Sequence, residues 1–158
     1  MDRLSHIDES GRPRMVDVSA KADTQREAVT KGTVHMKAQT FDLIKKGQIA
    51  KGDVLTVAQI AGIMAAKQTP GLIPLCHPLL LSEIKVEFEM DEKEHAILIT
   101  STVKNSGKTG VEMEAMTATA VAALTIYDMC KAVDRGMRLD DIRLIRKSGG
   151  KSGTIQLE

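Results

Sequence analysis

The fold is decided by the run Ala115-Met-Thr-Ala-Thr-Ala-Val-Ala-Ala-Leu-Thr-Ile-Tyr127, which contains thirteen residues and no charge. A helix that is apolar on nearly every face is normally buried on nearly every face. We therefore predict a long core helix from about Val111 to Val133, around which the rest of the chain must be arranged.

A second stretch of the same kind runs from Val54 to Lys67 and carries no charge before its last residue. Asp53 is a good N-cap for this helix, and Thr69-Pro70-Gly71 is expected to end it. Gln39 to Lys46 is predicted as a short helix. One face of a sheet cannot bury two helices that are apolar all round, so association of subunits is the simplest way to cover the remainder.

Four strands are predicted from alternation and β-propensity. In the clearest, Ile84 to Asp91, apolar residues alternate with charged ones. Gln25–Met36 precedes it, Ala96–Lys104 follows as its hairpin partner, and Ile142–Ile145 forms the last strand. The order strand, helix, strand, strand, helix, strand is that of the ferredoxin-like βαββαβ fold, an α+β fold with helices on one face of an antiparallel sheet.

A single domain is expected, because 158 residues can form one substantial core but not two ordinary domains. Residues 1–14 are polar and aperiodic, which predicts a flexible N-terminal arm. We assign the ferredoxin-like domain to residues 15–147 and a flexible C-terminal tail to residues 148–158. Three prolines between Pro70 and Pro78 predict a stiff loop without regular secondary structure.

Composition argues against several classes of partner. The formal net charge is +1 and aromatic residues make up 2% of the chain, so neither nucleic acid nor a membrane surface is indicated. We find no membrane span and no signal peptide, which makes the cytoplasm the default location. Cys76 and Cys130 lack a Cys-x-x-Cys partner, so we expect reduced thiols and no zinc site.

The first candidate for chemistry is the pair Asp128 and Lys131, which lie one helical turn apart at the end of the long apolar helix. An acid and an amine that leave a buried helix are expected beside a pocket, where burial shifts pKa values as proton transfer requires. For an isolated pair of this kind, a structural ion pair is the alternative.

Further candidates lie in loops and at a helix start. His77 is held between Cys76 and Pro78, in a rigid loop that would fix the ring for acid-base work. Gly107-Lys108-Thr109 lacks the earlier glycine of a phosphate loop, although a phosphate could still lie nearby. Glu112 and Glu114 could simply complement the helix dipole. Lys51 could be an ordinary turn residue.

Four segments, in this order, resemble the MoaC family, the cyclic pyranopterin monophosphate synthases of molybdenum cofactor biosynthesis. They are Gly71-Leu-Ile-Pro-Leu-Cys-His-Pro-Leu79, Lys108-Thr-Gly-Val-Glu-Met-Glu-Ala-Met116, Asp128-Met-Cys-Lys131 and Lys147-Ser-Gly-Gly-Lys151. The resemblance covers nearly the whole chain after the arm. The His-Pro loop and the Glu-Met-Glu helix start are specific to the family.

The resemblance implies a lyase that acts without redox chemistry. Its substrate would be (8S)-3',8-cyclo-7,8-dihydroguanosine 5'-triphosphate, which is derived from GTP. The products would be the pterin compound cyclic pyranopterin monophosphate and pyrophosphate. By resemblance, the catalytic residues are Asp128, Lys131, Lys51, His77 and Glu112. Which of Asp128 and Lys131 moves a proton is left open, because burial would lower the pKa of the lysine while the pairing would raise it.

The resemblance also implies the binding residues. The base would be recognised around Leu75, Cys76, His77, Met113 and Glu114, and the triphosphate by Lys21, Arg26, Lys67 and Lys147. The Glu114 carboxylate can accept two hydrogen bonds from a guanine-like edge.

The assembly implied by the resemblance is a hexamer, a trimer of dimers with active sites at subunit interfaces. No cofactor would be required and no metal would be resident, although Mg²⁺ could accompany the triphosphate.

Two alternatives belong to other functional classes. Ferredoxin-like domains also serve as oligomeric regulatory modules that bind small metabolites without turning them over. A purely structural oligomer could use buried charges to fix subunit register. For both, Asp128→Ala would alter stability or binding rather than abolish a reaction.

Overall fold

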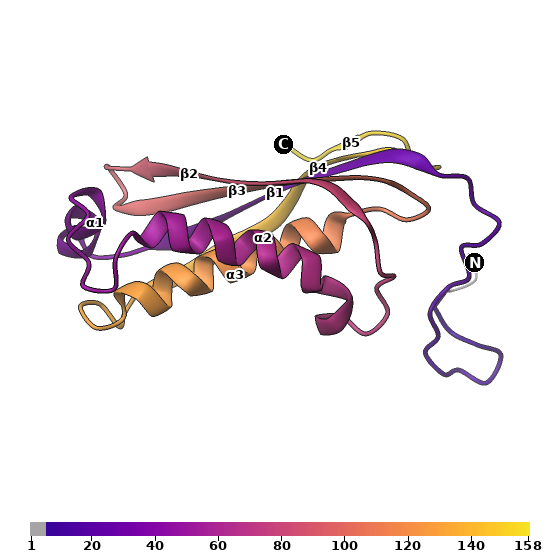
Figure 1. Cartoon of the computed structure of the whole chain (residues 1–158), viewed down its shortest axis with the longest axis horizontal. Helices are drawn as coiled ribbons and strands as arrows, with labels where there is room; N and C mark the ends of the chain where they lie inside the picture. Colours follow the sequence, from indigo (N-terminus) through magenta and orange to yellow (C-terminus); the bar gives the residue numbers. More distant parts are fainter. Residues whose placement is uncertain (1–5) are drawn as a thin grey trace.

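A five-stranded antiparallel sheet in the order β2-β3-β1-β4-β5 forms one layer of the computed structural model, which describes residues 6–158 (Figure 1). The strands are β1 (Thr24–His35), β2 (Leu81–Asp91), β3 (Ala96–Gly107), β4 (Arg138–Ser148) and β5 (Ile155–Gln156). The order of the first four is the ferredoxin-like order, so that prediction is confirmed. The β5 strand is an addition at the edge.

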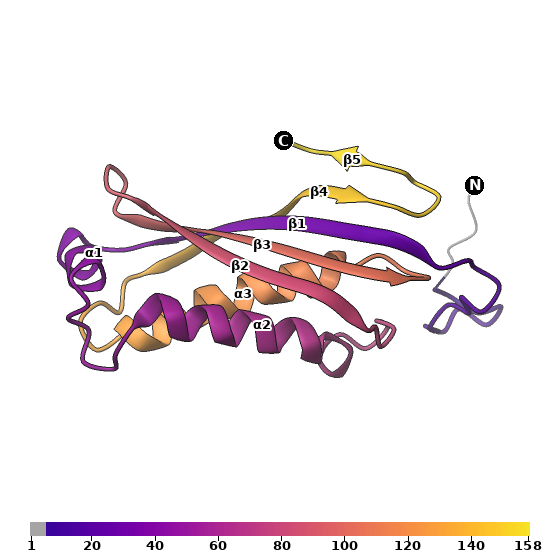
Figure 2. The same ribbon diagram turned by 45° about the horizontal axis from the view of Figure 1, so that its top comes forward.

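The helices are α1 (Ala38–Lys45), α2 (Val54–Leu72) and α3 (Glu112–Cys130). The two long ones, α2 and α3, lie side by side on one face of the sheet (Figure 2). Asp53 caps α2 as predicted, because its side chain accepts a hydrogen bond from Thr56 N at 3.1 Å.

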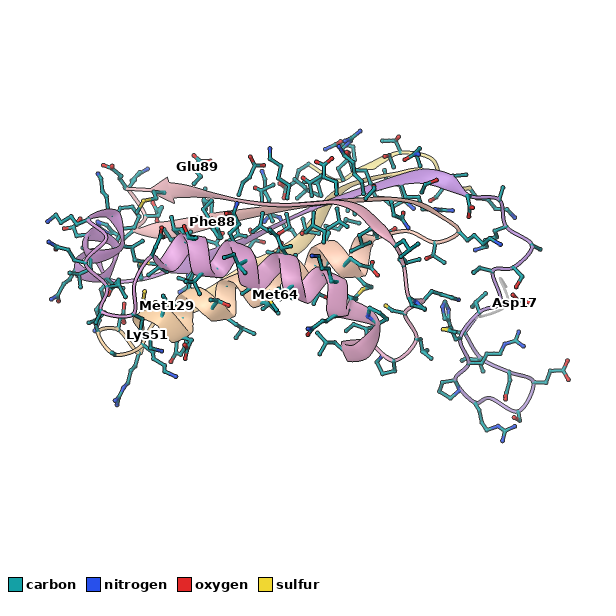
Figure 3. All side chains as sticks on the ribbon, viewed as in Figure 1. Asp17, Lys51, Met64, Phe88, Glu89 and Met129 are labelled. Atoms are coloured by element: carbon teal, nitrogen blue, oxygen red, sulfur yellow. The ribbon has the colours of Figure 1, made fainter. Side chains whose placement is uncertain are left out.

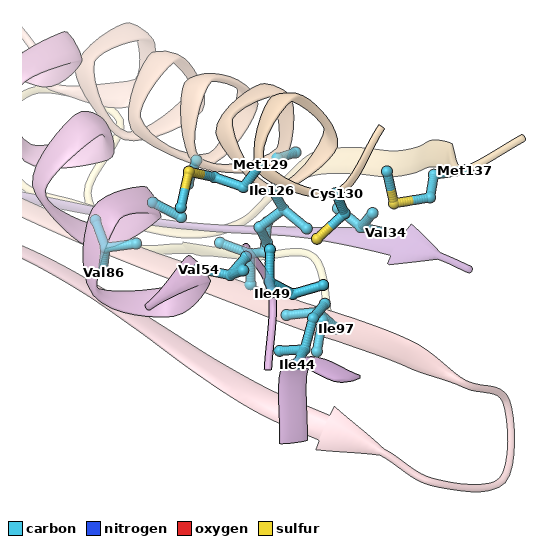
Figure 4. Packing of buried hydrophobic residues seen from close by; sticks show 14 of the residues in the cluster. Val34, Ile44, Ile49, Val54, Val86, Ile97, Ile126, Met129, Cys130 and Met137 are labelled. Atoms are coloured by element: carbon cyan, nitrogen blue, oxygen red, sulfur yellow. The ribbon is translucent and has the colours of Figure 1, made fainter. Parts of the chain in front are cut away.

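The main core lies between the two long helices and the sheet, and part of it is shown in Figure 4. Val34, Val86 and Ile97 come from three neighbouring strands and are fully buried, as is Ile126 of α3. The alternation predicted for β2 is present, since Val86 is buried while Lys85 and Glu87 are exposed.

Buried hydroxyls fix α3 on the sheet. Thr119 Oγ1 donates to Ser101 Oγ of β3 at 2.8 Å and lies 2.8 Å from Thr30 Oγ1 of β1. Thr30 Oγ1 also donates to the carbonyl oxygen of Ala115 at 2.9 Å. Because hydrogen bonds are directional, these contacts set the position of α3 along the sheet and therefore where its two ends lie.

The helices α2 and α3 cross closely at Gly62. A Cβ atom on Gly62 would lie 3.0 Å from the carbonyl oxygen of Ala118, 3.2 Å from Val86 and 3.4 Å from Ala122. The alanine-rich sequence of α3 therefore allows an approach that larger side chains would prevent.

We predict that Gly62→Val destabilises the fold by about 1–3 kcal/mol, because the added methyl groups overpack this crossing. Urea unfolding would measure the change. Gly71→Val is the matched control, since Gly71 lies in the same helix and an added Cβ would meet nothing within 4 Å. Equal stability of the two variants would contradict this account of the crossing.

The predicted end of α2 was wrong. The helix continues through Pro70 to Leu72, and Ile73 N donates to the carbonyl oxygen of Thr69 at 2.9 Å. Thr69 Oγ1 also donates to the carbonyl oxygen of Ala65 at 3.2 Å. Proline in the last turn removes only one intrahelical donor, which this packed helix tolerates. The irregular loop is therefore shorter than predicted and begins at Ile73.

The chain ends also differ from the simplest expectation. Within the predicted arm, residues 6–14 form a turn that is closed by a bridge between Ile7 and Pro13, while residues 1–5 lie outside the described residues. After Ser148 the chain turns back and pairs Ile155 with Lys147. The segment predicted as a tail thus contains a short strand, and the flexibility of both ends stays a prediction.

Candidate active site

A cavity of about 420 Å³ lies between the start of α3 and the loop that follows α2. We call it the main cavity. It brings together segments that are distant in the sequence. Predicted site residues in its lining are Lys21, Arg26, Leu75, Cys76, His77, Glu112, Met113 and Glu114.

His77 contacts the N-terminal segment. A short turn, in which Cys76 N donates to the carbonyl oxygen of Ile73 at 3.1 Å, directs the loop into the cavity. His77 Nε2 lies 2.7 Å from the carbonyl oxygen of Val16, and because a carbonyl can only accept, Nε2 carries the proton. Burial raises the pKa of the Cys76 thiol, with a smaller contribution from Glu114, which argues against a thiolate nucleophile.

Glu114 is the buried acid of the site. Glu114 is only 3% exposed, although it lies in the first turn of α3. A carboxylate that only complemented the helix dipole could stay exposed to solvent. Burial raises the pKa of Glu114 above its ordinary value, and the nearby Glu112 adds to this rise. A carboxyl group in such a place is suited to accept hydrogen bonds from a polar ligand in the cavity.

Glu112 lies beside Glu114 but has a cation near it. Its carboxylate is 3.4 Å from Lys147 Nζ, which brings the end of β4 to the start of α3. Gly110 makes room for this carboxylate, since an added Cβ would lie 2.0 Å from Glu112 Oε2. Lys147 is therefore placed at the site, although it is not part of the cavity lining described above.

Two cations organise the loop between β3 and α3. Arg26 donates from Nε to the carbonyl oxygen of Gly107 at 2.8 Å and from Nη2 to that of Lys108 at 3.1 Å. Lys108 Nζ donates to the carbonyl oxygen of Ser19 at 2.8 Å and lines the main cavity. The sequence prediction did not include Lys108 among the site residues, although it had left open that a phosphate could lie near this loop.

The other predicted catalytic residues form a separate group, which we call the lysine pair site. Asp128 Oδ1 lies 2.7 Å from Lys131 Nζ, and Asp128 Oδ2 lies 2.8 Å from Lys51 Nζ. Lys51 Nζ also donates to the carbonyl oxygen of Asp128 at 2.9 Å. One carboxylate thus holds two ammonium groups, one from the C-cap residue of its own helix and one from the loop before α2.

The expectation that Asp128 and Lys131 are buried was wrong for the single chain, because their side chains are 56% and 52% exposed. Hydrogen bonds from Lys131 and then Lys51 lower the pKa of Asp128 to about 2, so it is ionised at neutral pH. The hydrogen bond and charge of Asp128 raise the pKa of Lys131. In the single chain, pairing and not burial therefore sets the direction of the Lys131 pKa shift, while the choice of the residue that moves the proton stays a prediction.

The main cavity and the lysine pair site lie at opposite ends of α3. Glu112 and Asp128 are sixteen residues apart in one helix, which corresponds to about 24 Å at the rise of an α-helix. Figure 3 shows the separation, with Lys51 at one end of the molecule and Asp17, near the main cavity, at the other. A single chain therefore does not bring all the predicted catalytic residues to one place.

Apolar side chains are exposed on the helices between the two groups. Val57, Ile60 and Met64 of α2 and Leu124 of α3 are all exposed. They stand on helices whose other faces pack on the core, which fits the prediction that the sheet cannot bury both helices completely. Such a patch is typical of an interaction surface.

Three further predictions concern Lys67, a metal site and a membrane-spanning helix. Lys67 is exposed on α2 and does not line the main cavity. Within residues 6–158, no three His, Cys, Asp or Glu side chains are grouped as a metal would require. No helix in the same part of the chain has the length and apolar character needed to cross a membrane.

Comparison with known proteins gives a consistent result. A model of the MoaC family matches residues 15–150. The chain is 62% identical over 153 residues to the cyclic pyranopterin monophosphate synthase of Heliobacterium modesticaldum, covering 97% of this chain and 96% of that protein. It is 57% identical over 158 residues to that of Roseiflexus castenholzii, covering 100% of each. For that of Listeria monocytogenes the identity is 55% over 157 residues, covering 99% and 98%.

Proposed function

Because this chain belongs to the MoaC family, we propose that it is a cyclic pyranopterin monophosphate synthase. It converts (8S)-3',8-cyclo-7,8-dihydroguanosine 5'-triphosphate to cyclic pyranopterin monophosphate and pyrophosphate in molybdenum cofactor biosynthesis. The observation that carries the proposal is the main cavity, in which the His77 loop, the buried Glu114 and the cations Lys21 and Lys108 surround one space. The relatives do not favour the alternative of a regulatory module without catalysis.

The reaction makes demands that these residues can meet. The purine ring must be rearranged by proton transfers. A sugar hydroxyl must also attack the α-phosphorus, while the bond between this phosphorus and the pyrophosphate oxygen breaks. The hydroxyl proton needs a base, and charge that develops on the leaving oxygen needs cations. We assign base recognition to Glu114 with Leu75, Cys76, His77 and Met113. Acid-base or orienting roles fall to His77 and Glu112.

The triphosphate is assigned to the cations that line the main cavity or lie beside it. Lys21 lines the cavity, and Lys147 reaches Glu112 from β4. Arg26 donates to two carbonyl oxygens and thereby supports the loop around Lys108. Lys67 lies outside this group in one chain, and its role with phosphate remains a prediction, as does Mg²⁺ bound with the triphosphate.

The catalytic site is proposed to combine two copies of the chain. In a two-fold symmetric dimer whose α2 and α3 faces meet, the helices of the two copies can run in opposite directions. The lysine pair site of one copy would then meet the main cavity of the other, and the patch of Val57, Ile60, Met64 and Leu124 would be covered. A trimer of such dimers gives the hexamer that we propose. We also propose that the enzyme works in the cytoplasm.

Turnover of enzymatically prepared substrate tests the proposed function. We expect stoichiometric release of pyrophosphate with formation of cyclic pyranopterin monophosphate, measured by a phosphate-coupled assay and by mass spectrometry. Reactions without the chain correct for spontaneous decay of the substrate. Tight binding of the substrate without either product would instead identify a regulatory module.

A further inference from the structure

Asn105 of β3 is a buried polar residue with an unsatisfied acceptor. The residue is 1% exposed, and its Oδ1 atom has no hydrogen-bond partner within residues 6–158. Its Nδ2 atom packs against Gly107, where an added Cβ would come within 2.7 Å. A buried acceptor without a donor costs free energy, so its presence needs an explanation.

Asn105 lines a second cavity, of about 340 Å³, which adjoins the main cavity. We call it the side cavity. The two cavities share Val18, His77, Leu79, Lys108 and Thr109 in their linings, so a ligand in one lies next to the other. The side cavity is therefore an extension of the candidate active site, and Asn105 is one of the residues that line it.

We propose that Asn105 Oδ1 accepts a hydrogen bond from a sugar hydroxyl of the nucleotide substrate. This inference rests on the proposed function and adds a specificity residue to it. A guanine nucleotide offers N–H groups on its base, hydroxyls on its sugar and oxygens on its phosphates. Glu114 matches the base N–H groups, and Lys21 and Lys108 match the phosphate oxygens.

The hydroxyls are the remaining donors, and an amide oxygen suits them. Phosphate oxygens that are ionised have no proton to donate to Asn105 Oδ1. The position of Lys108 also favours a sugar hydroxyl as the donor. Lys108 lines both cavities and would hold the phosphate next to the sugar. Asn105 would thereby help to fix the sugar relative to the α-phosphate, which the cyclisation requires.

A test uses GTP, 2'-deoxy-GTP and 3'-deoxy-GTP as ligands whose binding is measured by calorimetry. GTP has the base, sugar hydroxyls and triphosphate of the substrate but is not cyclised. We expect the wild type to bind GTP about 3- to 10-fold more tightly than one of the deoxy compounds, the range of one net hydrogen bond. The Asn105→Leu variant should bind GTP and that deoxy compound with equal affinity.

Stability gives a second and independent readout. If Asn105 Oδ1 awaits a ligand, Asn105→Leu should raise the Tm of the ligand-free protein, because it removes an unsatisfied buried group. Asn105→Ala, which also lacks the acceptor, repeats the binding comparison if the leucine variant does not fold. A purely structural Asn105 would give a lower Tm and unchanged discrimination between the ligands, which would overturn the proposal.

Thr24 provides the matched control. Its Oγ1 atom is also buried without a partner within residues 6–158, but Thr24 lines neither cavity. Thr24→Val should therefore keep the discrimination between GTP and the deoxy compounds. Wild-type turnover of the true substrate is measured in parallel. If the wild type turns over the substrate and Asn105→Leu still discriminates between GTP and the deoxy compounds, only the proposed role of Asn105 is refuted. If the wild type does not turn over the substrate, the proposed function itself is refuted.

Discussion

Replacing Asp128 by asparagine should lower kcat by about 10²- to 10⁴-fold, the usual contribution of a group that takes part in acid-base catalysis. The amide has the size of the carboxylate but cannot hold the ammonium groups of Lys51 and Lys131 by charge. These contacts are 2.8 and 2.7 Å in the present structure. Single-turnover measurements on matched folded oligomer would separate chemistry from product release.

Glu92→Gln is the control for this substitution. Glu92 is an exposed carboxylate that also pairs with a lysine, Lys45, but it lies in neither of the two site groups. Its amide variant should turn over as the wild type does. If Asp128→Asn were equally active, Asp128 would be only a structural ion pair, as its exposed position in one chain would otherwise suggest.

The pH dependence of the activity of Asp128→Asn tests whether Asp128 raises the pKa of Lys131. Asp128 raises the pKa of Lys131, which keeps the ammonium charged to higher pH. Removing the carboxylate lowers that pKa again, so the alkaline limb of the residual activity should move to lower pH if charged Lys131 is required. Because the pKa of Asp128 is about 2, its own protonation should not limit the wild type at neutral or mildly acidic pH.

The main features of the fold could be predicted from local patterns. The patterns of the four predicted strands, clearest in β2, and the nearly uncharged sequences of α2 and α3 were sufficient to derive a sheet with two helices on one face. Pro70 was misjudged because its cost depends on how firmly the helix around it is packed, which a sequence does not state. The β5 strand has only two residues and its pairing with β4 is tertiary, so no periodicity could indicate it.

The site was predictable in part. His77 in a proline-rich loop and Glu114 at a helix start were noticed from local patterns, but the family resemblance made them site residues, and the structure places both at one cavity. Lys108 and Asn105 were missed because their importance comes from neighbours that are far away in the sequence. The burial of Asp128 was overestimated, since an apolar helix can leave its surplus surface exposed until another chain covers it.

The distance between the main cavity and the lysine pair site was, by contrast, already present in the sequence. Sixteen helical residues between Glu112 and Asp128 require about 24 Å, so no packing of one rigid helix could bring the two groups together. Either one group is not catalytic, or two chains share each site. This alternative leads to the second prediction with a large effect.

Mixing two inactive variants should restore activity if each site uses two chains. We expect Asp128→Asn and His77→Ala each to be nearly inactive as pure oligomers. After the two are dissociated together and reassembled, half of the dimers are mixed, and one of the two sites in each mixed dimer has both wild-type residues. The mixture should therefore recover about a quarter of wild-type specific activity, as random pairing in a two-fold dimer requires.

The control mixes Asp128→Asn with Lys131→Ala, whose lesions lie in the same lysine pair site. Every site of a mixed dimer then carries one of the two lesions, so activity should stay at the level of the pure variants. Native mass spectrometry would verify that mixed oligomers form in both experiments. If mixed oligomers form and the Asp128 and His77 variants still do not complement each other, the main cavity and the lysine pair site do not meet across an interface. The lysine pair site then either takes no part in catalysis or acts within its own chain after a rearrangement.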